Sequence, residues 1–201
     1  MDLRLSARFL SGRDLYEEVI RDGVMKARRS VWIATANLKE LFVEGDGLKR
    51  RRYRSLLETF DELAARGVDL RILHGGPPSR RFRAAYDKRP ALVKGGLRLK
   101  HCPRVHLKTV ILDGERIYLG SANLTGAGLG AKGDDRRNFE MGFVSDAPHL
   151  LDQVQSFFDA LWRGGPCEGC ALRELCPDPG PYATKKPKRR ALKVLRLDDV
   201  E

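Results

Sequence analysis

Long apolar runs are absent from this 201-residue sequence, in which no stretch approaches the roughly eighteen apolar residues needed to span a bilayer. The first ten residues, MDLRLSARFL, also lack the extended apolar core of a secretory signal. We therefore expect a soluble, cytoplasmic protein without integral membrane association.

Acidic residues are scarce relative to basic ones. The chain carries 27 Asp and Glu against 38 Lys and Arg, which gives a formal net charge of +11. An excess of this size favours a polyanionic partner, either nucleic acid or an anionic membrane surface. Apolar residues make up 42% of the chain, enough for a folded domain rather than a disordered tail.

Cysteines are few and unevenly placed. Cys102 stands alone, whereas Cys167, Cys170 and Cys176 fall within ten residues. In a cytosolic protein, such clustering favours a metal or cluster site over disulfides. Three clustered thiolates suit tetrahedral zinc, with Cys102, His101 or His149 as the fourth ligand. A disulfide, or reduced thiols without a ligand, are the alternatives.

Helical and strand-like patterns alternate along the first 164 residues, which predicts a mixed α/β sandwich around one sheet. After Gly164 the composition changes. We infer a core over 1–164, a cysteine-bearing extension over 165–183 and a basic tail over 184–201. The expected helices cover 13–29, a segment with Tyr53 to Ala64 on its apolar face, 80–87 and a segment starting at 146–148; the expected strands cover 30–37, 68–74, 97–102, 105–112, 116–121 and 138–145.

One stretch of the sequence, VHLKTVILDGERIYLGSANLT over 105–125, concentrates reactive side chains. His106 and Lys108 are two apart, so on a strand they project from the same face. An imidazole is a competent nucleophile near neutral pH. Lysine, serine and asparagine can neutralise or hydrogen-bond phosphoryl oxygens. Each of these residues alone is more often structural, but together they indicate phosphodiester chemistry.

The spacing His106-x-Lys108-x4-Asp113-x6-Gly-Ser121-x-Asn123 resembles the HxK-x4-D-x6-GSxN signature of the phospholipase D superfamily. The resemblance covers about residues 10–163. Within the superfamily, the chain is similar to the short, Nuc-like nucleases, which have a single motif. It implies a mixed sheet flanked by helices and phosphodiesterase activity that needs no metal. It also assigns Glu140 to orient the imidazole, while the turn position of Asp113 favours a supporting role.

Members of this superfamily use two such motifs, one histidine as nucleophile and the other as acid. This chain contains one motif and no internal repeat. The resemblance therefore implies a homodimer with one shared site and a phosphohistidine intermediate. Nucleic acid, DNA or RNA, is the favoured substrate. The alternatives are a phospholipid phosphodiesterase or transphosphatidylase, and a non-catalytic nucleic-acid-binding module.

The cysteine run CEGCALRELC resembles the motif of iron–sulfur nucleases of the Cas4 and AddB type. In those proteins a distant upstream cysteine completes the ligand set of a [4Fe–4S] cluster. The resemblance implies that Cys102, Cys167, Cys170 and Cys176 bind such a cluster, with structural zinc as the alternative.

Overall fold

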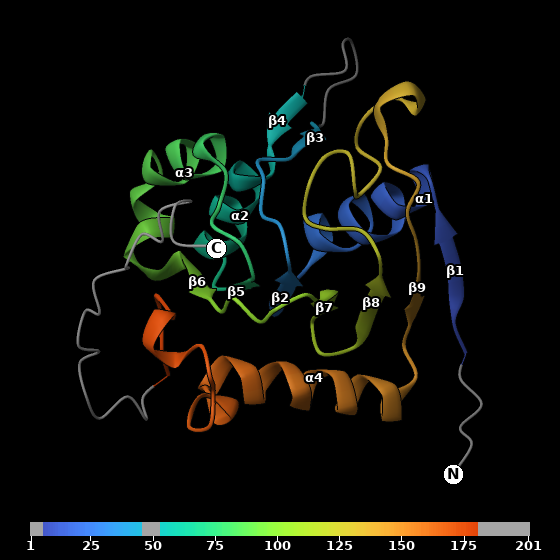
Figure 1. Cartoon of the computed structure of the whole chain (residues 1–201). Coiled ribbons are helices and arrows are strands. Elements are labelled where there is room, and N and C mark those ends of the chain that lie inside the picture. The colour runs from blue at the N-terminus through green and yellow to red at the C-terminus, as the bar shows by residue number, and fades with distance from the viewer. Residues whose placement is uncertain (1–5, 46–52, 181–201) are drawn as a thin grey trace, which may run out of the picture.

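The computed structural model describes residues 6–45 and 53–180, and one mixed sheet organises them (Figure 1). Its strands follow the order β1-β9-β8-β7-β2-β5-β6. Strands β2, β5 and β6 run parallel, whereas every other neighbouring pair is antiparallel. The strands are β1 (Arg8–Ser11), β2 (Ser30–Thr35), β5 (Asp69–His74), β6 (Leu97–His101), β7 (Lys108–Leu112), β8 (Arg116–Gly120) and β9 (Met141–Ser145).

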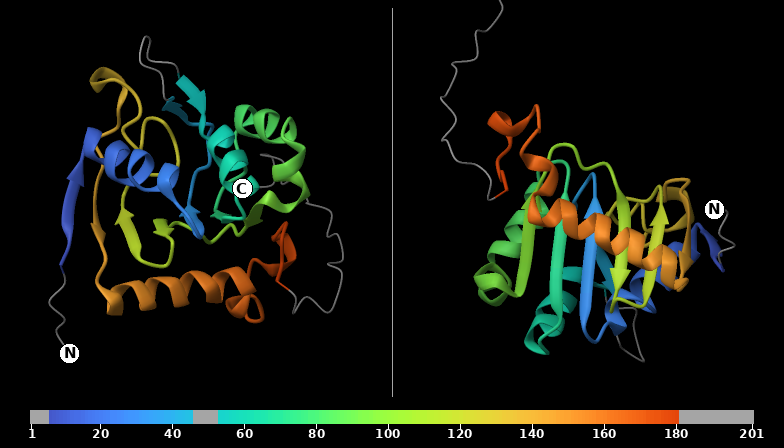
Figure 2. Two further views of the ribbon diagram at one scale, coloured as in Figure 1. Left: turned by 180° about the vertical axis from the view of Figure 1, so that it is seen from behind. Right: turned by 90° about the horizontal axis from the view of Figure 1, so that it is seen from below.

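Helices cover both faces of the sheet, as Figures 1 and 2 show. On one face lie α1 (Arg13–Leu15), continued by a π-helical segment (Tyr16–Arg21), then α2 (Leu56–Ala65) and α3 (Arg80–Asp87). The long helix α4 (Pro148–Arg163) crosses the opposite face. The expected α/β class, a mixed sheet flanked by helices, is confirmed.

Strand periodicity divides the core between these faces. Val31 and Ile33 of β2 face the larger apolar cluster with α2, whereas Ala34 belongs to the cluster under α4. In the same way Val110 and Ile111 of β7 belong to different clusters. Successive side chains of a strand point to opposite faces, so these nearly continuous apolar strands are those of a sheet buried on both sides.

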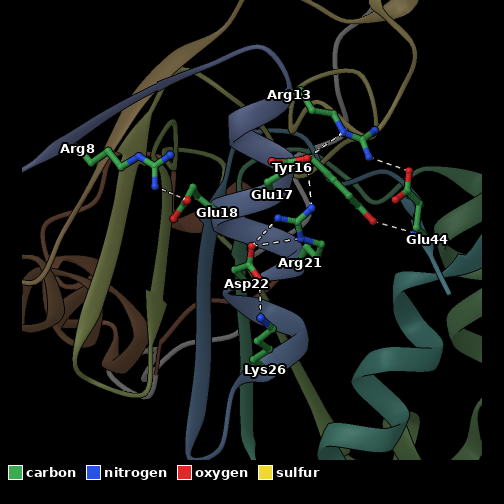
Figure 3. Close-up of polar contacts among 9 residues, drawn as sticks. All are labelled: Arg8, Arg13, Tyr16, Glu17, Glu18, Arg21, Asp22, Lys26 and Glu44. Atoms are coloured by element: carbon green, nitrogen blue, oxygen red, sulfur yellow. Dashed lines mark hydrogen bonds and ion pairs between the residues drawn. The ribbon is translucent and has the colours of Figure 1, made fainter. Parts of the chain in front are cut away.

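Polar contacts attach the N-terminal helix to the rest of the molecule (Figure 3). The hydroxyl of buried Tyr16 accepts a hydrogen bond of 2.8 Å from the Glu44 amide, and Arg13 pairs with the Glu44 carboxylate at 2.7 Å. Burial raises the pKa of Tyr16 above its usual value. Glu44 lies on β3 (Phe42–Glu44), which pairs with β4 (Tyr53–Ser55) in a separate two-stranded sheet. The contacts hold this small sheet against α1.

The sequence patterns missed β1, β3 and β4 and misassigned Tyr53. It was expected on a helix, but it pairs with Glu44 in β4, and α2 begins only after Ser55. The Ser55 hydroxyl accepts a hydrogen bond from the Leu57 amide and so caps the helix there. Tyr53 lies three residues before Leu56 and so matches the apolar spacing of the helix, which explains the error.

Three other expected elements begin or end a few residues away from their predicted boundaries. The helix expected over 13–29 ends with a 3₁₀ turn at Val24–Lys26, and the strands expected from 105 and 138 begin at Lys108 and Met141. Short helical turns complete the structure at Leu92–Gly96, Asp134–Arg136, Gly165–Cys167 and Arg173–Leu175.

The expected basic tail over 184–201 and residues 181–183 of the extension lie outside the described residues, and so does the basic run KRRR at 49–52. None of the helices in residues 6–45 and 53–180 combines the length and apolar character needed to cross a bilayer.

Candidate active site

The strand register brings most motif residues to one edge of the sheet. Thr35 at the end of β2 pairs with Lys108 at the start of β7. Thr109 pairs with Leu119, so β8 ends beside the start of β7. Gly120 at that end pairs with Gly142 of β9. His106, Ser121, Asn123 and Glu140 all lie in the connections that enter or leave these strand ends.

His106 and Lys108 are in direct contact. His106 is exposed and precedes the first residue of β7. The Lys108 ammonium lies 3.0 Å from Nδ1 and 3.2 Å from Nε2 of the imidazole, and it donates to the His106 carbonyl at 2.8 Å. The two side chains therefore share a face as predicted, although His106 itself lies just outside the strand.

Ser121 and Glu140 form a second pair at this edge. The Ser121 hydroxyl donates to Glu140 and accepts from the Met141 amide at 3.1 Å. The other carboxylate oxygen of Glu140 accepts from the Asn138 side chain at 3.2 Å. Among the described residues no hydrogen bond joins Glu140 to His106, the contact that the resemblance implied. In this structure the carboxylate positions the Ser121 hydroxyl.

Asn123 is held by the end of β2. Its side-chain oxygen accepts a hydrogen bond of 3.0 Å from the Asn37 amide. The Thr35 hydroxyl accepts from the Leu124 amide at 3.0 Å and thus fixes the next residue as well. With the oxygen engaged, the Asn123 side-chain NH₂ group remains a donor for an anionic ligand. Sequence analysis did not single out Thr35 or Asn37, because their partners lie almost ninety residues away.

Asp113 lies at the opposite end of β7 from Lys108. Its carboxylate accepts hydrogen bonds from the amides of Arg28, Arg29 and Ser30, at the start of β2. Burial alone would raise the pKa of Asp113, but these backbone donors outweigh it and hold the pKa below its usual value. The geometry gives this motif residue an anchoring function away from His106.

Gly120 of the motif is required by close packing. A Cβ atom at this position would lie 2.3 Å from the Tyr118 hydroxyl oxygen and 2.6 Å from the Met141 carbonyl oxygen. The buried Tyr118 accepts a hydrogen bond from the Ala122 amide at 3.3 Å, and burial raises its pKa to about 12. Glycine thus lets the Ser121–Asn123 loop approach β9.

Two further histidines occupy the same sheet edge. His74 and His101 are paired in register on β5 and β6, and their rings stack at 4.9 Å. Each bonds to a backbone carbonyl, of Gly76 and Gly75 respectively, at 2.9 Å. Burial lowers the pKa of His74. Both rings are thus engaged by the fold.

A basic cavity of about 540 Å³ opens beside the motif. Lys39, Arg80, Arg81 and Lys132 supply positive charge to its lining, with Glu40 as an acidic neighbour. The half-exposed rings of Phe42 and Tyr53 also line it. Asn123 connects this basic cavity to the motif residues.

All four cysteines line a different cavity, of about 430 Å³, together with His106. They are free thiols. Arg104 donates to Cys170 and lowers the pKa of that thiol, whereas burial raises the pKa of Cys176. Within the described residues, no three His, Cys, Asp or Glu side chains already have the arrangement of a metal site.

The model of the cardiolipin synthase PLD-like domain family matches residues 20–162. The chain belongs to the PLD-like family. Family membership supports phosphodiesterase activity. A search of curated protein sequences found no significant match.

Solved structures agree with the PLD-like fold. NucT from Helicobacter pylori has a TM-score of 0.56 and 17% identity, covering 79% of this chain and 96% of its own. Nuc from Salmonella typhimurium has a TM-score of 0.54 and 18% identity, and the match covers 78% of this chain and 95% of Nuc. Phosphatidylserine synthase from Haemophilus influenzae has a TM-score of 0.52 and 19% identity. The match covers 78% of this chain but only 38% of the synthase. At these identities the likeness establishes the fold alone.

Proposed function

We propose that this PLD-like chain is a nuclease that cleaves DNA or RNA through a phosphohistidine at His106, in a site shared by two copies of the chain. The observation that carries the choice of nucleic acid is the basic cavity beside Asn123. The shared site follows from the single HxK motif, because one histidine cannot serve as both nucleophile and leaving-group acid in the same step.

The contacts at the sheet edge suggest a role in the reaction for each motif side chain. The His106 imidazole attacks phosphorus, and the bond from phosphorus to the leaving oxygen breaks as that oxygen takes a proton from the His106 of the second copy. Lys108 compensates the charge of the phosphoryl oxygens, and the Asn123 NH₂ group donates a hydrogen bond to them. The Ser121 hydroxyl donates to them when its single proton turns away from Glu140. We assign Glu140 to hold the Ser121 hydroxyl and to supply the carboxylate that stabilises an imidazolium at this edge.

The second half of the reaction restores the enzyme. The second copy's His106, now neutral, takes a proton from water, and the resulting oxygen nucleophile attacks the phosphohistidine. The bond between phosphorus and nitrogen breaks, which releases a phosphate monoester and frees the first imidazole. No step requires a divalent metal.

The basic cavity favours a polynucleotide over a phospholipid. Lys39, Arg80, Arg81 and Lys132 can neutralise several phosphates of one strand. Phe42 and Tyr53, 47% and 53% exposed, offer ring faces on which unpaired bases can stack. Similar solved folds include Nuc, NucT and TrmBL2, an archaeal chromatin protein whose structure shows DNA binding (TM-score 0.52, 14% identity, covering 80% of this chain and 53% of its own).

The test is cleavage of single- and double-stranded DNA and RNA in excess EDTA. We expect wild-type cleavage and a loss of at least about a thousandfold in His106→Ala, because removing a nucleophile removes the covalent path. His149→Ala, at an exposed position in the first turn of α4, is the matched histidine control and should retain activity.

The rival functions give different results in the same assay. Cleavage of vesicle phospholipids, with nucleic acid left intact, would establish a lipid phosphodiesterase. Salt-sensitive nucleic-acid binding with no cleavage in any buffer, unchanged by His106→Ala, would establish a binding module. Either result would overturn the nuclease proposal.

A further inference from the structure

The segment after α4 folds without an apolar core of its own. Gly164, with a φ of 81°, ends the helix, and tight turns follow over residues 165–176. Within residues 165–180, all of them described, no apolar side chain is fully buried, and Leu175 is 78% exposed. A short segment that buries so little apolar surface needs another source of stability, such as a metal or a disulfide.

Backbone turns connect the segment's three cysteines, all of which line one cavity. The Cys170 amide bonds to the Cys167 carbonyl at 3.4 Å, and the Cys176 amide bonds to the Arg173 carbonyl at 3.2 Å. The Cys176 thiol lies 3.8 Å from the His101 carbonyl oxygen, at the end of β6. The segment therefore contacts His101, the residue directly before Cys102.

Cys102 completes the set from across the cavity. It follows β6, more than sixty residues before the other three, yet all four thiols line the same 430 Å³ space. The fold thus selects among the fourth ligands that the sequence left open. His101 is engaged by Gly75 and His74, and His149 is not part of the cavity lining. Binding of one metal centre by all four thiols requires changes of χ1 rotamer, since the described side chains are not yet arranged as a metal site.

We propose that Cys102, Cys167, Cys170 and Cys176 form a tetrathiolate site for a thiophilic metal centre, either one zinc ion or one [4Fe–4S] cluster. Four thiolates suit both centres, at tetrahedral zinc or at the four irons of a cluster. The centre fastens residues 165–180 to the end of β6. It lies outside the hydrogen-bonded groups proposed for phosphodiester cleavage and does not depend on that function.

The site also fixes the loop that carries His106. The Val105 amide bonds to the Cys102 carbonyl at 2.9 Å, which closes a turn over residues 102–105. Arg104, Val105, His106 and Leu107 line the same cavity as the four thiols. A ligated Cys102 therefore restrains the start of the loop and makes the metal site a positioning element for His106.

The test uses the full chain, purified without oxygen or chelator. Zinc, iron and acid-labile sulfide are measured per chain, followed by X-ray absorption at the edge of the metal found. We expect about one zinc with four sulfur neighbours near 2.3 Å, or about four irons with sulfide and the absorption spectrum of a cluster. Both results support the site, and they distinguish its occupants.

Serine variants test the ligand set. Each of Cys102→Ser, Cys167→Ser, Cys170→Ser and Cys176→Ser should lower metal content to below about a tenth of wild type, because one lost thiolate weakens a closed site strongly. Glu168→Ser, at an exposed position between two of the cysteines, is the control and should keep its metal. In hydrogen exchange, residues 102–107 and 165–180 should lose protection together in the cysteine variants but not in Glu168→Ser.

The wild-type spectroscopy keeps the proposal testable if a serine variant fails to fold. A wild-type chain that carries no metal, and takes up neither zinc nor iron with sulfide on reconstitution, overturns it. So does a metal shell made of nitrogen and oxygen, or a disulfide between any two of these cysteines in the anaerobically purified protein.

Discussion

Asp113 and Lys108 lie at opposite ends of one five-residue strand, although both belong to the same sequence motif. Lys108 contacts the His106 imidazole, whereas the Asp113 carboxylate accepts hydrogen bonds from three backbone amides at the start of β2. The carboxylate satisfies these backbone donors, and Asp113 itself adopts the left-handed conformation of the turn, with a φ of 56°. Motif membership therefore does not imply contact with substrate.

We expect Asp113→Asn to lower the free energy of unfolding by about 1–2 kcal/mol at pH 7, because charge-assisted hydrogen bonds become neutral ones. Asparagine tolerates the same backbone conformation, so the change removes the charge and one acceptor oxygen without straining the turn. The pKa of folded Asp113 is depressed, so its stabilisation is present above the unfolded value near 3.9 and is lost as pH falls through the folded value.

The measurement is urea unfolding of both proteins between pH 7 and pH 3. The difference between them should shrink below about pH 4. Asp135→Asn, whose carboxylate is 79% exposed in a surface ion pair, should leave stability unchanged within about 0.5 kcal/mol. A pH-independent difference would show that the charge of Asp113 is not what stabilises the turn.

Side-chain partners within the site were predictable only where they are close in sequence. The two-residue spacing of His106 and Lys108 predicted that they share a face, and the structure adds their direct contact. The bond between Ser121 and Glu140 depends on the pairing of β8 with β9, and the bond between Asn37 and Asn123 depends on where β2 lies in the sheet. Neither local propensity nor motif spacing encodes these non-local registers.

At the scale of elements, the segments with strong periodicity were predicted and the short ones were not. The turn at 113–114, the helix over 80–87 and the start of α4 at Pro148 agree with expectation. Strands β1, β3 and β4 are only three or four residues long; β1 pairs with the distant β9, and β3 and β4 pair with each other. Such short strands carry too few alternating positions to be recognised.

Helix α4 stabilises the sheet through one face of aromatic side chains. Phe158 is 1% exposed and stacks between Trp32 at 5.5 Å and Trp162 at 5.9 Å, whereas its neighbour Phe157 is 55% exposed. We expect Phe158→Ala to lower the free energy of unfolding by about 3–5 kcal/mol and Phe157→Ala by less than about 1 kcal/mol, measured by urea unfolding. Equal losses in the two variants would contradict the packing of α4.

At the scale of the whole molecule, the single motif predicts a dimer that acts as one unit. Light scattering should give twice the chain mass of 22.6 kDa. When wild type and His106→Ala are unfolded together and refolded at equal amounts, about half of the wild-type chains should pair with the variant. Mixed dimers hold one histidine, so activity per wild-type chain should fall to about half. Unchanged activity per wild-type chain would show that one copy suffices.

The arrangement of the site at one sheet edge also shapes how this protein can diversify. The motif side chains near His106 and the lining of the basic cavity come mostly from connections between strands, while the strands themselves form the doubly covered core. Insertions and exchanges in connections are tolerated far better than changes in buried strands. Under the proposed function, substrate preference can therefore change by replacement of these loops while the sheet is kept.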